Sequence, residues 1–162
     1  ERFVQAHYRS SIAPQEGLSE LWKDVFLYHW KEEAQHAVLD ELELLAENAK
    51  LDPARRDAAL SEFIALVGAV DGILGGGAAP AAGYYPAIAG ERYSEAQRRE
   101  VGALVLKAYR WQYIVSGAME PRFQKVLFGM LDPEQAVRVQ NALAPPTYAV
   151  PHQPGMAMPM AA

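Results

Sequence analysis

The sequence predicts an all-α protein built as a helical bundle, and three observations lead to this prediction. The stretch from Leu21 to Asn48 contains no glycine and no proline, which leaves room for one helix about 42 Å long. The dipeptide Asp-Pro, an N-cap residue followed by proline at the first helical position, occurs at 52–53 and again at 132–133. No segment shows the alternation of apolar and polar residues that is typical of a half-buried strand.

Caps and helix breakers set the bounds of the expected elements. We expect helices over 3–12, 21–48, 53–74, 94–117, 123–130 and 133–143. Ser19 is a suitable N-cap for the second of these, and Ser94 with Gln97 forms a capping box before the fourth. The glycines at 75–77 are predicted to end the third helix and to open a loop over 75–90. The bundle domain then covers 1–143, and the segment 144–162, rich in proline and methionine, is predicted to be a disordered tail.

Composition excludes several classes of protein. The chain has 162 residues, of which 51% are hydrophobic and 22% charged, so one ordinary globular domain is expected rather than a disordered chain. The net charge of −5 makes nucleic acid an unexpected partner, because phosphate would repel an acidic surface. Without cysteine there can be no disulfide, thiolate zinc site or iron–sulfur cluster. No run of 18 consecutive apolar residues occurs, so we expect no transmembrane helix and no membrane partner.

The chain opens on helical sequence rather than on methionine. Glu1-Arg2-Phe3-Val4 contains neither an initiator methionine nor the basic and apolar regions of a signal peptide. We therefore expect a processed or partial product of a longer protein, located by default in the cytoplasm.

A possible metal motif lies on the long helix predicted over 21–48. His29, Glu33 and His36 follow each other at intervals of four and three residues, which places all three within an arc of about 60° on one helix face. Glu33-x-x-His36 has the spacing used by di-iron and di-manganese bundles, in which carboxylate and imidazole point at one metal ion and the carboxylate can bridge to a second. Glu32 points about 100° away from Glu33, so only one of the two is predicted to be a ligand.

The same stripe has a simpler interpretation as a solvated acidic face, since it continues through Asp40, Glu43 and Glu47. Against this, the face begins with Trp22, Val25 and Phe26. The helix is also apolar nearly all round near its middle, which indicates burial there. Buried histidine and glutamate require partners or a metal ion, and this favours the metal site.

The motif His29-x-x-x-Glu33-x-x-His36 resembles the last ligand helix of the ferritin-like di-iron oxygenases. The similarity is greatest to the p-aminobenzoate N-oxygenase type, which has an extra histidine one turn before its Glu-x-x-His. It covers about 50 residues, and it implies a ferritin-like bundle that binds two iron ions, or manganese, and oxidises a small organic substrate with O₂. An earlier helix of that family supplies another glutamate ligand, and Glu1 is the position here that could match it.

This sequence departs from the family pattern because it holds at most half of such a site. A di-metal bundle needs carboxylates from four helices and a second Glu-x-x-His. The other histidines are His7 and His152, and neither they nor His29 has an acidic residue three positions earlier. The other half is expected from a missing N-terminal segment or from another subunit, such as a homodimer partner. Otherwise the half-site is degenerate, and the chain is a metal-free structural or interaction protein.

Two further residues are candidates for supporting a ligand. Asp71 follows the apolar stripe of Leu60, Ile64 and Val67, so it is expected either to accept a hydrogen bond from a ligand histidine or to reach solvent at a helix end. His7 could lie near the site, although an ordinary surface histidine is the simpler interpretation.

Overall fold

The computed structural model describes residues 2–89 and 93–151, and within these ranges it contains helices and no β-strand. The elements, in chain order, are α1 (Arg2–His7), η1 (Tyr8–Ile12), α2 (Glu20–Lys50), α3 (Pro53–Ala89), α4 (Glu95–Arg110), η2 (Trp111–Val115), α5 (Ser116–Ala118), α6 (Pro121–Met130), α7 (Pro133–Leu143) and η3 (Pro145–Ala149). The all-α class is therefore confirmed. Here η1 and η2 are wider π-helical turns, and η3 is a short 3-10 helix.

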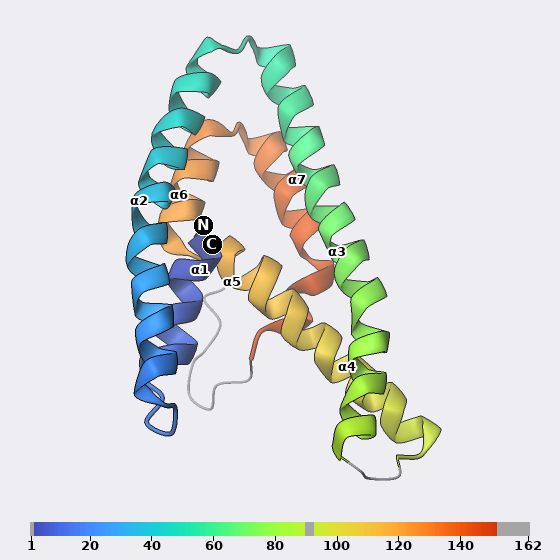
Figure 1. Ribbon diagram of the computed structural model, residues 1–162. Helices are drawn as coiled ribbons and strands as arrows, with labels where there is room; N and C mark the ends of the chain where they lie inside the picture. Colours follow the sequence, from blue (N-terminus) through green and yellow to red (C-terminus); the bar gives the residue numbers. More distant parts are fainter. Residues whose placement is uncertain (1, 90–92, 152–162) are drawn as a thin grey trace.

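Two long helices frame the molecule (Figure 1). α2 and α3 form a hairpin that turns at residues 51–52, and α6 and α7 form a shorter hairpin between them. α1 lies beside α2, and α4 runs along the C-terminal half of α3. The chain thus forms an arch whose N-terminal limb carries the predicted metal motif.

The predicted helix starts are confirmed by their capping hydrogen bonds. The Ser19 hydroxyl accepts from the Trp22 amide at 3.2 Å, so α2 begins at Glu20. The Ser94 hydroxyl accepts from the amide of Gln97, whose side chain in turn accepts from the Ser94 amide. Asp52 caps α3 through the amide of Arg55 at 2.9 Å. Each cap satisfies an amide that the first helical turn leaves without a partner.

The loop predicted over 75–90 is wrong, because α3 continues as a helix to Ala89. Ala78 and Ala82 are both buried, and a Cβ added to Gly102 of α4 would lie 3.7 Å from the Cβ of Ala82. Small residues one turn apart let α4 approach closely, and this tertiary contact outweighs the low helix propensity of Gly75–Gly77 and Pro80.

The predicted disordered tail is partly wrong. Residues 145–149 form η3, in which Pro146 and Ala149 are buried. The Tyr148 hydroxyl accepts from Nη1 of Arg110 at 3.0 Å, which ties this segment to the end of α4. The remainder of the predicted tail, 152–162, lies outside the described residues.

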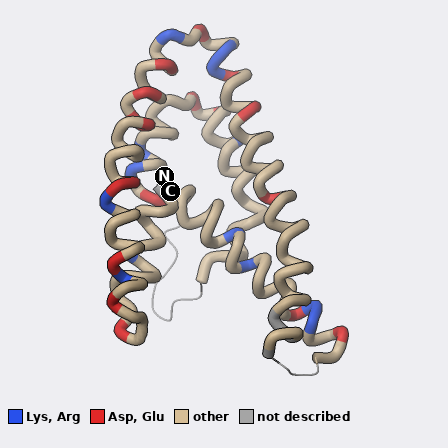
Figure 2. Tube along the Cα trace, in the orientation of Figure 1, with Lys and Arg blue, Asp and Glu red and all other residues tan. Residues whose placement is uncertain are grey.

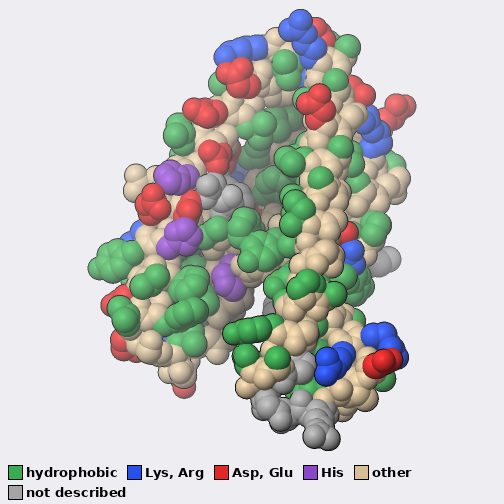
Figure 3. Space-filling view, turned by 45° about the vertical axis from the view of Figure 1, so that its right-hand side comes forward, with side chains coloured by type: hydrophobic (Ala, Val, Ile, Leu, Met, Phe, Trp, Pro, Cys, Tyr) green, Lys and Arg blue, Asp and Glu red, His purple; other side chains and the backbone are tan. Residues whose placement is uncertain are grey.

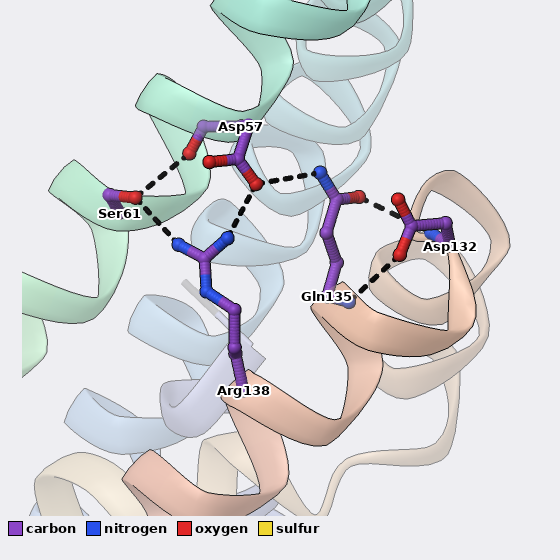
Figure 4. Close-up of polar contacts among 5 residues, drawn as sticks. All are labelled: Asp57, Ser61, Asp132, Gln135 and Arg138. Carbon is purple, nitrogen blue, oxygen red and sulfur yellow. Dashed lines mark hydrogen bonds and ion pairs between the residues drawn. The ribbon is translucent and has the colours of Figure 1, made fainter.

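A polar cluster joins α7 to the N-terminal part of α3 (Figure 4). Asp57 accepts hydrogen bonds from Gln135 at 3.2 Å and from Arg138, and Arg138 also donates to Ser61 at 2.6 Å. The Gln135 amide donates to the Asp132 cap, so one residue serves both the start of α7 and the link to α3. The hydrogen bond from Gln135, and then that from Arg138, lowers the pKa of Asp57.

The space inside the arch is an apolar groove of about 660 Å³. It is lined by residues of α2, α3, α6 and α7, among them Leu44, Phe63, Val67, Phe123, Leu127 and Val139. The best-buried large side chain is Val115 of η2, with no exposed surface. η2 contacts α1, α4, α5 and η3, so the core of the described chain lies at this crossing rather than between α2 and α3.

One described helix, Pro53–Tyr84, is long and apolar enough to span a membrane by length and composition, with a mean hydropathy of 1.7 in its most apolar 18-residue window. Only 6% of that window is buried within the structure. A single helix that passes this test by length and composition alone is weak evidence for a membrane, so the absence of a membrane partner stays a prediction.

Candidate metal site

The predicted metal motif lies near the middle of α2, where the Glu33 side chain contacts both histidines. Nε2 of His29 lies 3.6 Å from one carboxylate oxygen of Glu33, and Nδ1 of His36 lies 3.2 Å from the other. Glu33 therefore stands between two imidazoles, one turn before it and one turn after it. We call His29, Glu33 and His36 the ligand trio.

Glu32 also contacts this cluster, although the sequence analysis predicted no role for it. Its carboxylate lies 3.5 Å from Nε2 of His36. Among the described residues, His29, Glu32 and Glu33 each offer an atom within 4.8 Å of the others, a spacing at which one metal ion can be held. The i,i+4 spacing of Glu32 and His36 could have revealed this contact, because flexible side chains at that spacing meet on a helix surface.

The predicted burial of α2 is wrong. The side chains of His29 and His36 are 47% and 48% exposed, whereas that of Glu33 is 15% exposed. Large apolar residues of α2, including Trp22, Val25 and Leu42, are at least half-exposed. Large apolar side chains therefore stay exposed on this helix, so periodicity identified an apolar face but not what covers it. Figure 3 shows the histidine side chains gathered on one face of the molecule beside acidic and apolar ones.

His7 lies next to the ligand trio rather than on a featureless surface. It lines a pocket of about 600 Å³ together with His29, and aromatic residues provide much of the wall: Phe3, Tyr8, Phe26, Tyr109, Trp111 and Tyr113. Nδ1 of His7 is buried and has no hydrogen-bond partner among the described residues. Burial also lowers the pKa of His7, which favours the neutral imidazole that metals and substrates accept.

Two π-helical turns border this pocket. η1 begins at Tyr8, directly after His7, and η2 contributes Trp111, Gln112 and Tyr113 to the wall. A π-turn inserts one extra residue into a helix and redirects the side chains around it, and such turns are frequent at functional sites.

Asp71 does not support a ligand histidine. Its two carboxylate oxygens accept from Nε and Nη2 of Arg110 at 2.6 and 2.7 Å, so it joins α3 to the end of α4. The Asp71 carboxylate and the Tyr148 hydroxyl raise the pKa of Arg110 further above its ordinary value. The ion pair with Arg110 therefore accounts for the Asp71 carboxylate in the apolar stripe.

We expect Asp71→Asn to lower the free energy of unfolding by about 1 kcal/mol, because a charged bidentate pair is lost from a partly exposed site. Urea denaturation measures this effect. Manganese affinity, measured by calorimetry, is expected to stay within about twofold of the wild type, since the pair does not contact the ligand trio. A fall of about tenfold or more would restore Asp71 to a role in supporting the ligands.

Glu1, the remaining candidate ligand, lies outside the described residues. The donors that the structure does bring together are imidazole nitrogens and carboxylate oxygens, a set that suits iron and manganese. A two-metal carboxylate site takes its ligands from four helices. Because one helix supplies all of these donors, they fit only part of such a site.

Comparisons with known proteins identify no family for this chain. No protein-family model matches the sequence, no curated protein matches it, and no solved structure matches the fold.

Proposed function

We propose that this chain provides one half of a two-metal site in a non-haem oxidoreductase that uses iron, or manganese, and O₂ to oxidise a small organic substrate. The observation that carries the proposal is the position of Glu33 between His29 and His36, with one carboxylate oxygen near each imidazole. This places two imidazole nitrogen donors and a carboxylate capable of bridging on the same helix face. The resemblance of the motif to the ligand helix of ferritin-like di-iron oxygenases points the same way.

Each residue of the site has a role that follows from its chemistry. His29, Glu33 and His36 would bind metal, and Glu32 is close enough to His36 to orient its ring or to serve as a further ligand. Bound iron would supply the electrons that reduce O₂. The aromatic wall beside His29 would hold an apolar or aromatic substrate and keep water away from it. His7 lines the same pocket, where its imidazole would contact the substrate.

Metal binding by the purified protein tests this proposal. The protein is prepared without a metal-affinity step and titrated with Mn(II) and, anaerobically, with Fe(II), and bound metal is measured by mass spectrometry. His36→Ala and Glu33→Gln are expected to weaken binding by at least about 100-fold, since even residues that only support a ligand are worth about 10–100-fold. Asp24→Asn is the matched control, because Asp24 is an exposed carboxylate on the opposite face of α2.

Thermal stability gives an independent measurement. At metal concentrations of about 100 Kd, binding to the native state adds about 2.7 kcal/mol, which corresponds to about 5–10 °C in Tm for a chain of this size. A chelator should remove this increment from the wild type and leave His36→Ala unchanged. Equal metal content in wild type and His36→Ala, or a Tm that does not respond to metal, contradicts the proposal.

A metal-free structural protein is the second candidate function. It is favoured by the half-exposed state of His29 and His36, because histidine and glutamate at these spacings also form ordinary ion pairs on helix surfaces. This function predicts that neither metal nor chelator changes Tm.

A further inference from the structure

We propose that a second copy of this chain completes the metal site, with the ligand trios of two α2 helices facing each other across a two-fold axis. The inference rests on the proposed function, and it identifies the partner that the half-site requires. A two-metal carboxylate site needs a second Glu-x-x-His from a facing helix. The chain offers this spacing only at Glu33 and His36, and a symmetric dimer supplies it twice.

The position of the ligand trio along α2 suits this geometry. α2 runs from Glu20 to Lys50, so Glu33 and His36 lie on either side of its midpoint. Two copies of α2 that cross antiparallel at their midpoints bring the two trios together and overlap along most of the helix length. A motif near a helix end would overlap only a short segment of its partner.

Apolar residues on the same face of α2 would form the contact around the metal ions. Trp22 and Val25 lie within about 60° of the trio on the helix circumference, and they are 50% and 58% exposed. Both precede the trio, and the same face continues after it through Asp40, Glu43 and Glu47. In an antiparallel pair, Trp22 and Val25 of the two copies lie on opposite sides of the metal ligands, so apolar side chains flank the polar centre at both ends.

The exposed area of the chain is large enough for a stable dimer. The chain exposes 11339 Å². The fifteen residues outside the described ranges can account for at most about 2,400 Å² of this area. A compact protein of the size of the described residues is expected to expose about 7,400 Å², so the described residues expose at least about 1,500 Å² more than expected. Part of that surplus lines the groove inside the arch, so two copies could bury at most about 3,000 Å² between them, and half of that area is already the size of a standard stable interface.

The negative charge of α2 is expected to make the dimer depend on metal. α2 carries eight carboxylates and three lysines, and Figure 2 shows the acidic positions distributed along it. Two such helices repel each other when they meet face to face, and divalent cations between the trios reverse the sign of that interaction. The dimer is therefore expected to form with metal and to separate without it.

A membrane is a less suitable cover for the exposed apolar surface. The candidate span in α3 contacts α4, whose Arg98, Arg99 and Glu100 are exposed. Inserting α3 would carry these charges toward the bilayer, which is costly for each of them.

Sedimentation of the full chain with Mn(II) and with EDTA tests the proposal. The expected mass is twice 17.8 kDa with Mn(II) and 17.8 kDa with EDTA, with one metal ion bound per chain. Glu33→Gln and His36→Ala should remain monomeric with Mn(II), whereas Asp24→Asn should dimerise. The paramagnetic resonance spectrum of the dimer should show two coupled Mn(II) ions, since the pair of a two-metal site lies about 3.5–4 Å apart.

Other outcomes overturn the dimer in distinguishable ways. Metal bound tightly by a chain that stays monomeric rejects the dimer and leaves the proposed function standing. Absence of metal binding rejects both. A dimer that persists in EDTA and in Glu33→Gln has an interface unrelated to the metal site. Association of the metal-free chain with phosphatidylcholine vesicles, in place of dimerisation, assigns the apolar surface to a membrane.

Discussion

The variant Val115→Asp is expected to lose its folded structure. Val115 has no exposed surface and lies at the crossing where η2 contacts α1, α4, α5 and η3. A carboxylate there must either stay ionised without water or take up a proton at neutral pH. A pKa raised by about 3–5 units costs about 4–7 kcal/mol, which is comparable to the whole stability of a typical domain.

Circular dichroism and urea denaturation check this result. Val137→Asp in α7 is the matched control, since Val137 is 53% exposed and should tolerate the same charge. Val115→Ala should fold and lose about 1–3 kcal/mol of unfolding free energy, because it removes buried methyl groups and leaves a small cavity. Equal stability of Val115→Asp and Val137→Asp would show that the helix crossing is not the core.

Replacing Gly117 with valine is expected to displace α1 from the body of the protein. A Cβ at Gly117 would lie 3.1 Å from the Cβ of Phe3 and 3.6 Å from its Cα and N. Two of these three atoms are backbone, so rotating the Phe3 side chain cannot relieve the contact. Overpacking of this kind costs about 1–3 kcal/mol. Since α1 carries His7, the pocket beside His29 should open as well.

Hydrogen exchange measures this change directly. The amides of α1 should exchange faster in Gly117→Val, whereas those of α7 should be unaffected. Gly129→Val in α6 serves as the control, because a Cβ at Gly129 meets nothing within 4 Å. Unchanged exchange in α1 would mean that Phe3 can move aside and that α1 is not held by this contact.

Both variants concern the same part of the molecule, where the core supports the pocket. Phe3 and Tyr113 form an edge-to-face ring pair with centroids 5.7 Å apart, which joins α1 to η2. Gln5 is buried and donates to the backbone oxygen of Trp30 at 2.9 Å, which joins α1 to α2 beside the ligand trio. α1 is therefore the element through which the core positions His7 against α2.

Local chemistry in the sequence was sufficient to predict the helix starts and the proximity of Glu33 to His29 and His36. The caps at Ser19, Asp52, Ser94 and Asp132 act on amides three residues away, so each depends only on its neighbours along the chain. The contacts of Glu33 with two histidines follow in the same way from helical spacing alone.

Contacts between distant segments decided the rest. The helix through 75–89 depends on α4 lying against Ala78 and Ala82, and no local propensity indicates this contact. Asp71 pairs with Arg110, 39 residues later, rather than with a ligand. Apolar periodicity also predicted a buried α2, whereas the described chain leaves much of that helix exposed. Periodicity shows which face of a helix is apolar, but burial depends on what packs against that face, and here we propose that a second copy does so.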